Sequence, residues 1–249
     1  MKTEENQATV SDAQRPAAID WRMLLVWTGM GVAVALLAFT AIIGEIIPPL
    51  IGFAVLYGIA VWLVRRGGKA GLIMMAVLSL LLLVSNSPFI IPALSVPAST
   101  VDFTMTGLLV VLALGNLVAA VAALRRSSSG AGARIAGRAI VALMLVVVAI
   151  AAVGRVTYES PVAQADDIQL TAADVEFSTD VIEASSGEVS VFVENNDAAL
   201  HTFTVEGLDV DLQVPGGSTA RVTFEATPGS YEFICKPHAD LMKGTLEVN

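Results

Sequence analysis

The sequence predicts two parts of different fold class: an all-α helical membrane domain with five spans, followed by an all-β sandwich. Composition is the first observation, since 55% of the 249 residues are hydrophobic and only 15% are charged, whereas soluble domains average about 25% charged residues. Charge distribution is the second, because residues 156–249 hold seventeen acidic and three basic side chains, and residues 1–155 hold six and eleven. The third is periodicity, which changes from long apolar runs to short alternating ones near residue 168.

Five apolar runs predict the membrane spans, because a helix needs about 20 mainly apolar residues to cross a bilayer. Inside the bilayer each segment must pair its own backbone polar groups, so helices are expected. The fifth run is short, and it reaches full length if Arg138 and Arg155 extend to the two membrane surfaces. The runs cover residues 23–43, 46–64, 70–89, 103–124 and 139–153.

Lys and Arg predict the orientation of these spans, because basic residues collect on the cytoplasmic side. They occur in the N-terminal tail and in the second and fourth connections, and the first and third connections have none. Residues 1–22 are therefore expected to be a cytoplasmic tail. The chain is expected in the cytoplasmic membrane, in contact with lipid, with its C-terminal part outside, either periplasmic or extracellular. The basic residues are Lys2, Arg15, Arg22, Arg65, Arg66, Lys69, Arg125, Arg126, Arg134 and Arg138.

Two polar residues of the membrane part, residues 23–153, are expected to be structural. Glu45 lies at the end of the first run beside two prolines, which favours an interfacial cap over an ion ligand. Asn116 lies in the middle of the fourth run beside Gly115, which favours a polar contact between helices. The helices are therefore expected to anchor the chain.

A linker and a β domain are expected to follow. Residues 154–167 have no apolar period and contain Pro161 and two adjacent acids, which is typical of a linker. Residues 168–249 alternate short β-type runs with turn residues, which predicts a β-sandwich of seven or eight strands. The clearest runs cover residues 181–184, 189–193, 201–205, 208–214, 220–226, 231–235 and 244–248.

Four side chains of the β domain are candidate metal ligands. His201 and His238 are the only histidines of the chain, Cys235 is its only cysteine, and Met242 is the only methionine after Met144. Each alone is typical of a core residue, but two imidazoles and a thiolate with a long thioether bond form a blue-copper site. The four together therefore predict one type 1 copper ion. Zinc is the alternative metal, since a Cys/His/His set is compatible with it.

The stretches ENNDAALHTFTV (194–205) and PGSYEFICKPHADLMKGTLEV (228–248) resemble the cupredoxins, the small blue copper proteins that include plastocyanin, azurin and halocyanin. The resemblance covers about residues 168–249 and implies a Greek-key sandwich. It implies His201, Cys235 and His238 as equatorial ligands and Met242 as the axial ligand.

The resemblance also implies an electron port, the apolar patch around the second histidine. Its residues here are His238, Pro237, Leu241 and Leu200. The chain departs from many members of the family at one position, because Thr202 stands where they have an asparagine directly after the first histidine. The gap from Cys235 to His238 is that of plastocyanin, and the gap from His238 to Met242 is that of azurin.

The expected function is single-electron transfer between a donor and an acceptor redox protein at the outer face of the membrane. The acidic domain favours a basic docking surface on such a partner, although an acidic surface also serves solubility alone. The alternative is a copper sensor, holder or chaperone that uses the helices as a docking platform. A transporter with a regulatory copper domain is disfavoured by the lack of paired charges within the spans.

Other classes are excluded by residue counts. Multicopper oxidases and nitrite reductases need many more histidines, and one copper ion moves one electron, so no substrate turnover is expected. One cysteine excludes a disulfide framework and any four-cysteine zinc or iron–sulfur site. A formal net charge of −9 provides no basic face for a nucleic acid.

Overall fold

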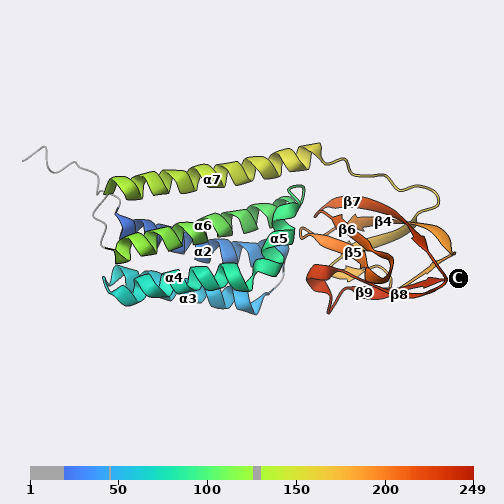
Figure 1. Cartoon of the computed structure of the whole chain (residues 1–249), viewed down its shortest axis with the longest axis horizontal. Coiled ribbons are helices and arrows are strands. Elements are labelled where there is room, and N and C mark those ends of the chain that lie inside the picture. Colours follow the sequence, from blue (N-terminus) through green and yellow to red (C-terminus); the bar gives the residue numbers. More distant parts are fainter. Residues whose placement is uncertain (1–19, 45, 126–129) are drawn as a thin grey trace, which may run out of the picture.

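The computed structural model describes residues 20–44, 46–125 and 130–249. It is elongated, with a bundle of helices at one end and a β domain at the other (Figure 1). The helices of the described residues are α2 (Trp21–Ile43), α3 (Pro48–Arg65), α4 (Lys69–Ser85), α5 (Ser87–Ser95), α6 (Thr100–Leu124) and α7 (Gly130–Thr157). Glu45, Arg126 and residues 1–19 of the expected cytoplasmic tail lie outside the described residues.

The predicted helical membrane domain is confirmed. Four helices, α2, α3, α6 and α7, are long and apolar enough to cross a membrane. The count of five spans holds when α4 and α5 are taken as one span, which bends by 65° at Asn86. Prolines explain the bend, because Pro88 opens α5 and Pro92 lies inside it, and proline disfavours a continuous helix on its N-terminal side.

The last helix is longer than its apolar run. Residues 139–153 lie inside α7. This helix begins at Gly130, before Arg138, and ends at Thr157, after Arg155. Most of its apolar side chains are exposed, among them Leu145 and Val153. Exposed apolar side chains along a helix of this length are expected where it faces lipid.

The interior of the bundle contains the polar contact that was expected at Asn116. The hydroxyl of Thr28 on α2 donates to the Asn116 Oδ1 on α6 at 2.6 Å, and both side chains are buried. A second buried pair joins Tyr57 on α3 to Ser79 on α4 at 3.0 Å. These bonds cross between helices in an apolar surrounding, so they help fix which helices are neighbours.

The β domain is the predicted sandwich, with a sheet in the order β2-β1-β4-β7 and a sheet in the order β3-β9-β8-β5-β6. Both sheets are mixed, since β1 runs parallel to β4 and β3 runs parallel to β9. Phe203 and Phe233 pack in its core with ring centroids 5.4 Å apart. The strands are β1 (Ile168–Ala173), β2 (Glu176–Phe177), β3 (Val181–Ala184), β4 (Gly187–Asn195), β5 (His201–Val205), β6 (Val210–Val214), β7 (Ser218–Ala226), β8 (Gly229–Ile234) and β9 (Lys243–Val248).

The segment between α7 and β1 lies against the β domain. The hydroxyl of Tyr158 donates to the backbone oxygen of Thr219 at 2.8 Å, and the hydroxyl of Thr219 donates to the oxygen of Pro161 at 2.7 Å. Arg221 forms an ion pair with Asp167 at 2.8 Å. The first four residues of the expected linker, 154–157, belong to α7, and the rest follows the surface beside β7.

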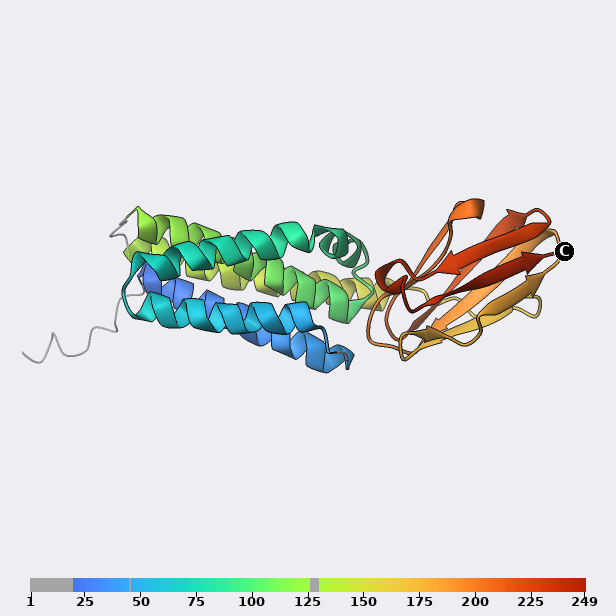
Figure 2. The ribbon, with the colours of Figure 1, turned by 90° about the horizontal axis from the view of Figure 1, so that it is seen from below.

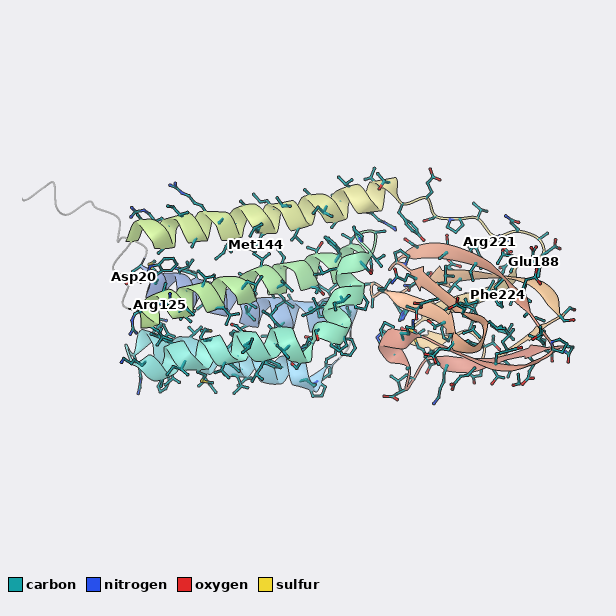
Figure 3. All side chains as sticks on the ribbon, in the orientation of Figure 1. Asp20, Arg125, Met144, Glu188, Arg221 and Phe224 are labelled. Atoms are coloured by element: carbon teal, nitrogen blue, oxygen red, sulfur yellow. The ribbon has the colours of Figure 1, made fainter. Side chains whose placement is uncertain are left out.

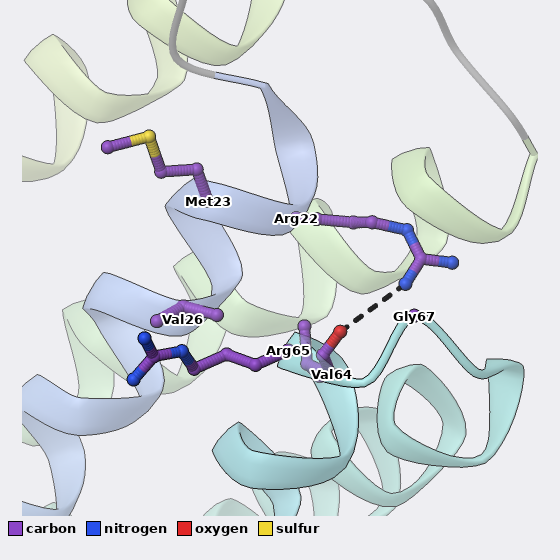
Figure 4. Close-up of a pocket in the computed structure, with 6 residues that line it drawn as sticks. All are labelled: Arg22, Met23, Val26, Val64, Arg65 and Gly67. Atoms are coloured by element: carbon purple, nitrogen blue, oxygen red, sulfur yellow. Dashed lines mark hydrogen bonds between the residues drawn. The ribbon is translucent and has the colours of Figure 1, made fainter. Parts of the chain in front are cut away.

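The two ends of the bundle differ. Asp20 and Arg125 lie at the end far from the β domain, and Glu188, Arg221 and Phe224 lie within the β domain (Figure 3). The far end holds a pocket of about 520 Å³ between α2 and α3, where Arg22 donates to the backbone oxygen of Val64 at 3.5 Å (Figure 4). The lining of this pocket offers no His, Cys, Asp or Glu among the described residues. The other end, called here the domain-facing end, is where α5 stands between the bundle and the sandwich (Figure 2).

Candidate metal centre

The four candidate ligands lie on segments that meet at one end of the sandwich. His201 opens β5, Cys235 follows β8, His238 ends a short 3-10 helix (Lys236–His238), and Met242 directly precedes β9. The loop between Cys235 and Met242 is closed by backbone hydrogen bonds. Cys235 N donates to Met242 O at 2.9 Å, and Met242 N donates to His238 O at 2.8 Å. The β8–β9 connection therefore holds three of the four residues in one compact turn.

Three donor atoms converge there. Cys235 Sγ lies 3.5 Å from His201 Nδ1 and 3.6 Å from His238 Nδ1, and one donor atom of each residue lies within 4.8 Å of the others. Ligand distances of about 2.0 Å for imidazole nitrogen and 2.3 Å for thiolate sulfur place the sulfur roughly 3.7 Å from each nitrogen in a trigonal plane. The spacing thus fits one metal ion at the centre. Across residues 20–44, 46–125 and 130–249, no other His, Cys, Asp or Glu cluster meets this criterion.

Burial differs among these residues. Cys235, His201 and Met242 are fully buried, whereas His238 is partly exposed. Met242 belongs to the core cluster that includes Phe233 and Leu246, directly beneath the ligand loop. His238 is therefore the edge of the group that reaches the surface.

Asp197 orients the first histidine. His201 Nε2 lies 2.8 Å from Asp197 Oδ2, and the same carboxylate accepts the backbone N–H groups of Asp174 and Val175 at 2.9 and 3.1 Å. Burial raises the pKa of Asp197, but the hydrogen bonds from Val175, His201 and Asp174 outweigh it and leave that pKa below its ordinary value. An ionised carboxylate that accepts the Nε2–H leaves Nδ1 with a lone pair for a metal.

The surroundings of the site favour the neutral imidazole that a metal ligand needs at His201. They disfavour the thiolate that a metal ligand needs at Cys235. Burial lowers the pKa of His201 despite the opposing effect of Asp197, so the imidazole is neutral and can ligate. Burial also raises the pKa of the Cys235 thiol above its ordinary value. A bound metal cation reverses that second effect, because a coordinating thiol is deprotonated.

Thr202 joins the two ligand segments. Its backbone N–H donates to Cys235 Sγ at 3.4 Å, and its hydroxyl accepts the backbone N–H of Lys236 at 2.8 Å. Many cupredoxins have an asparagine at this position. Here the threonine connects β5 to the loop that carries Cys235, so the departure in sequence still leaves the two strands joined.

The structure places Leu200, Pro237 and His238 of the expected electron port on one cavity that faces the helices, and Leu241 outside its lining. Leu241 is 73% exposed, and Pro237 is partly exposed. Leu200 is buried in a small cluster with Val96 and Ala98, from the connection between α5 and α6. The surface near His238 therefore has one side open to water and one side that faces the helices.

Hydrogen bonds hold the ligand end of the sandwich against the bundle. Asp102, in the first turn of α6, accepts the N–H of Leu200 at 2.7 Å and the hydroxyl of Ser99 at 2.8 Å. Ser99 in turn accepts the N–H of Gly216 at 3.4 Å. At the next two residues of the same segment, Arg155 of α7 donates to the oxygen of Gly217 at 2.9 Å and to the Ser218 hydroxyl.

Sequence reasoning did not identify Asp102 or Asp197 as part of this arrangement. Asp102 carried a usable signal, because an acid at the end of an apolar run is uncommon and needs a partner. Asp197 carried none, since acidic residues are abundant throughout the β domain.

A comparison with protein-family models agrees with the fold of this part of the chain. Residues 139–248 match the family model described as the cupredoxin-like domain. The C-terminal part of the chain is a cupredoxin-like domain, joined to helices that are apolar enough to span a membrane. With the His201, Cys235 and His238 group, this supports one copper ion as the cofactor.

Amicyanins are among the solved structures to which the chain shows similarity. Amicyanin from Paracoccus versutus is 18% identical, with coverage of 35% of this chain and 85% of that chain and a TM-score of 0.30. The reduced Cu(I) form of an amicyanin mutant at pH 4 is 23% identical, with coverage of 35% and 86% and a TM-score of 0.31. No curated protein matches the chain.

Proposed function

We propose that this chain is a membrane-anchored type 1 copper protein that carries single electrons between redox proteins at the outer face of the cytoplasmic membrane. The observation that supports this most is the buried group of His201 Nδ1, Cys235 Sγ and His238 Nδ1. These three residues would hold the copper, and the sulfur of Met242 would complete the ligand set. Bound copper supplies a centre that alternates between two oxidation states by one electron.

The residues around this group hold the candidate copper ligands in one arrangement. Asp197 holds His201, the loop hydrogen bonds hold Cys235 and Met242, and Thr202 connects the two segments. Ligands that are already in place move little when the charge of the metal changes, and small movement favours fast electron transfer. Burial of Cys235 and His201 also slows loss of the metal, which favours a carrier over a protein that hands copper to a partner.

The distribution of charge supports an orientation of the chain in the membrane and a kind of surface on its redox partner. Arg65 ends α3, Lys69 begins α4 and Arg134 lies near the start of α7. These helix ends lie at the end of the bundle far from the sandwich (Figure 1), which supports an inside position for that end and an outside position for the copper domain. In residues 156–249 two of the three basic side chains are paired, Arg221 with Asp167 and Lys236 with Asp211. Lys243 and many acidic side chains remain, so the net charge of this part is strongly negative, and it would attract a basic docking surface in a salt-dependent manner.

The function is tested by cycling the full-length protein in detergent. The copper-loaded protein is reduced and reoxidised electrochemically through many cycles in the presence of a Cu(I) chelator, and bound copper is measured before and after. A carrier returns to the same spectrum with its copper retained. Transfer of the copper to the chelator on reduction would contradict electron transfer and favour the copper holder.

A further inference from the structure

A cavity of about 760 Å³ lies between the domain-facing end of the bundle and the ligand end of the sandwich. Pockets for small molecules usually measure about 300–1,000 Å³. The cavity is lined by five helices, α2 to α6, and by the copper domain, where Pro237 and His238 belong to its wall. It is therefore bounded both by segments that cross the membrane and by a proposed copper ligand.

The lining changes in polarity from one end to the other. The wall made by the spanning helices is apolar and includes Leu36, Phe39, Leu83 and Leu109. Most of the polar side chains of the lining lie on the wall made by the copper domain, beside the apolar Ala199, Leu200 and Pro237. They are Thr202, Asp211, Gln213, Lys236 and His238, with Asp102 of α6 at the boundary. Because the helices reach into the membrane, this gradient suits a molecule with an apolar tail and a small polar head.

The bent span makes room for such a molecule. α4 ends at Ser85, and α5 leaves it at 65° and crosses the domain-facing end of the bundle (Figure 2). Phe89 and Ala93 of α5 contribute to the lining. The side of the bundle between α5 and α6 thereby gives the cavity part of its wall at the membrane surface.

Charge restricts the head of the molecule. Asp102 and Asp211 are the acids of the lining, and Lys236 is its cation among the described residues. Lys236 is paired with Asp211 at 2.7 Å. Since the site offers two acids and a cation already neutralised, it suits an uncharged head better than the phosphate of a phospholipid.

We propose that this cavity binds a membrane-borne quinone or its quinol, with the tail among the helices and the ring beside Pro237 and His238. Quinones combine an apolar tail, an uncharged ring and electron-transfer chemistry, which are the three properties that the lining and its position require. The inference rests on the proposed function, because it names the class of molecule that would exchange electrons at His238. Oxidation of one quinol to a quinone releases two electrons and two protons, so it would reduce the single copper(II) of the chain twice, with reoxidation by the acceptor protein between the two transfers, and the protons would pass to water.

Binding is tested on the full-length protein in detergent by calorimetric titration with a short-chain ubiquinone. Thr106 and Thr104 provide a matched pair, because both are on α6 and only Thr106 lines the cavity. We expect saturable binding that Thr106→Phe weakens by about tenfold or more and Thr104→Phe leaves unchanged. Equal affinity of the two variants, or tighter binding of a phosphatidylglycerol that displaces the quinone, would overturn the proposal.

Two further measurements keep the test independent of copper and of folding defects. The titration is repeated on Cys235→Ser, which lacks the thiolate, and unchanged quinone affinity there supports the cavity even if the copper function fails. A photoreactive azidoquinone is then attached by illumination to the full-length protein without substitutions. The labelled peptides are identified by mass spectrometry. Labels in α5, α6 or the loop at 236–238 support the site, and labels confined to the far end of the bundle contradict it.

Discussion

Buried polar groups are arranged differently in the helical bundle and in the copper domain. In the bundle the buried polar contacts are isolated pairs, such as Thr28 with Asn116, surrounded by apolar side chains. In the copper domain the buried polar groups form one connected network, in which Asp197 contacts His201 and Thr202 contacts Cys235. Isolated pairs select helix neighbours, whereas a connected network positions donor atoms. The comparison indicates that the polar contacts of the bundle fix the arrangement of its helices, whereas those of the copper domain fix the positions of the candidate metal ligands.

The largest expected effect is confined to the copper domain. Replacement of Cys235 by serine removes the thiolate, so we expect the type 1 copper spectrum to disappear while the helices stay intact. Visible absorption reports on the copper, and far-ultraviolet circular dichroism reports on the helices. If Cys235→Ser remained blue, the ligand assignment would be wrong.

The network makes Asp197 the next most sensitive position. Without its carboxylate the ring of His201 loses the partner that fixes its orientation, and loss of such a partner weakens metal affinity by about 10–100-fold. We expect Asp197→Ala to show this in a competition titration with a copper chelator. Glu194→Ala is the matched control, because Glu194 is an exposed acid nearby with full copper affinity expected. Equal affinities in the two variants would show that the network does not support the site.

The thioether is expected to tune the site without being required for it. Met242→Leu should keep copper and raise the reduction potential, by about 60 mV or more, which is tenfold in the equilibrium constant of a one-electron couple. Met144→Leu, in α7, is the control that changes a methionine outside the copper domain. Cyclic voltammetry measures both. A potential in Met242→Leu equal to that of the control would remove Met242 from the ligand set.

The smallest expected effect concerns the contact between the two parts. Asp102→Ala deprives the N–H of Leu200 of its acceptor, and a lost buried hydrogen bond costs about 1–3 kcal/mol. We expect faster hydrogen exchange at Leu200 with an unchanged copper spectrum. Glu225→Ala, an exposed acid on β7, serves as the control. Exchange at Leu200 that is the same in both variants would show that Asp102 does not hold the domain.

Residue type and spacing were sufficient to predict most of the fold and the core of the site. The apolar runs predicted the helices, and the rare ligands His201, Cys235 and His238 predicted the metal group, because their chemistry is visible in the residues themselves. The bend at Asn86 was missed because the apolar run 70–89 continues through it, although Pro88 lies within that run and Pro92 lies just beyond it. Four residues of the expected linker are helical, since an apolar pattern does not show that a helix extends past Arg155.

What the sequence could not predict depends on contacts between distant residues. Asp102 meets Leu200 across 98 positions, and Ser99 meets Gly216 across 117. Such contacts have no local pattern, because they arise only when the two parts have folded and docked. The cavity beside His238 is of the same kind, since its walls come from separate helices and from the copper domain.

The most direct test of the central claim is the spectrum of the full-length protein loaded with one equivalent of Cu(II). Visible absorption and electron paramagnetic resonance are recorded on the same sample in detergent. Two imidazoles, a thiolate and a weak thioether predict an intense thiolate-to-copper band and a narrow hyperfine splitting. A colourless protein, or a splitting as wide as that of ordinary Cu(II) complexes, would contradict a type 1 copper site at His201, Cys235, His238 and Met242.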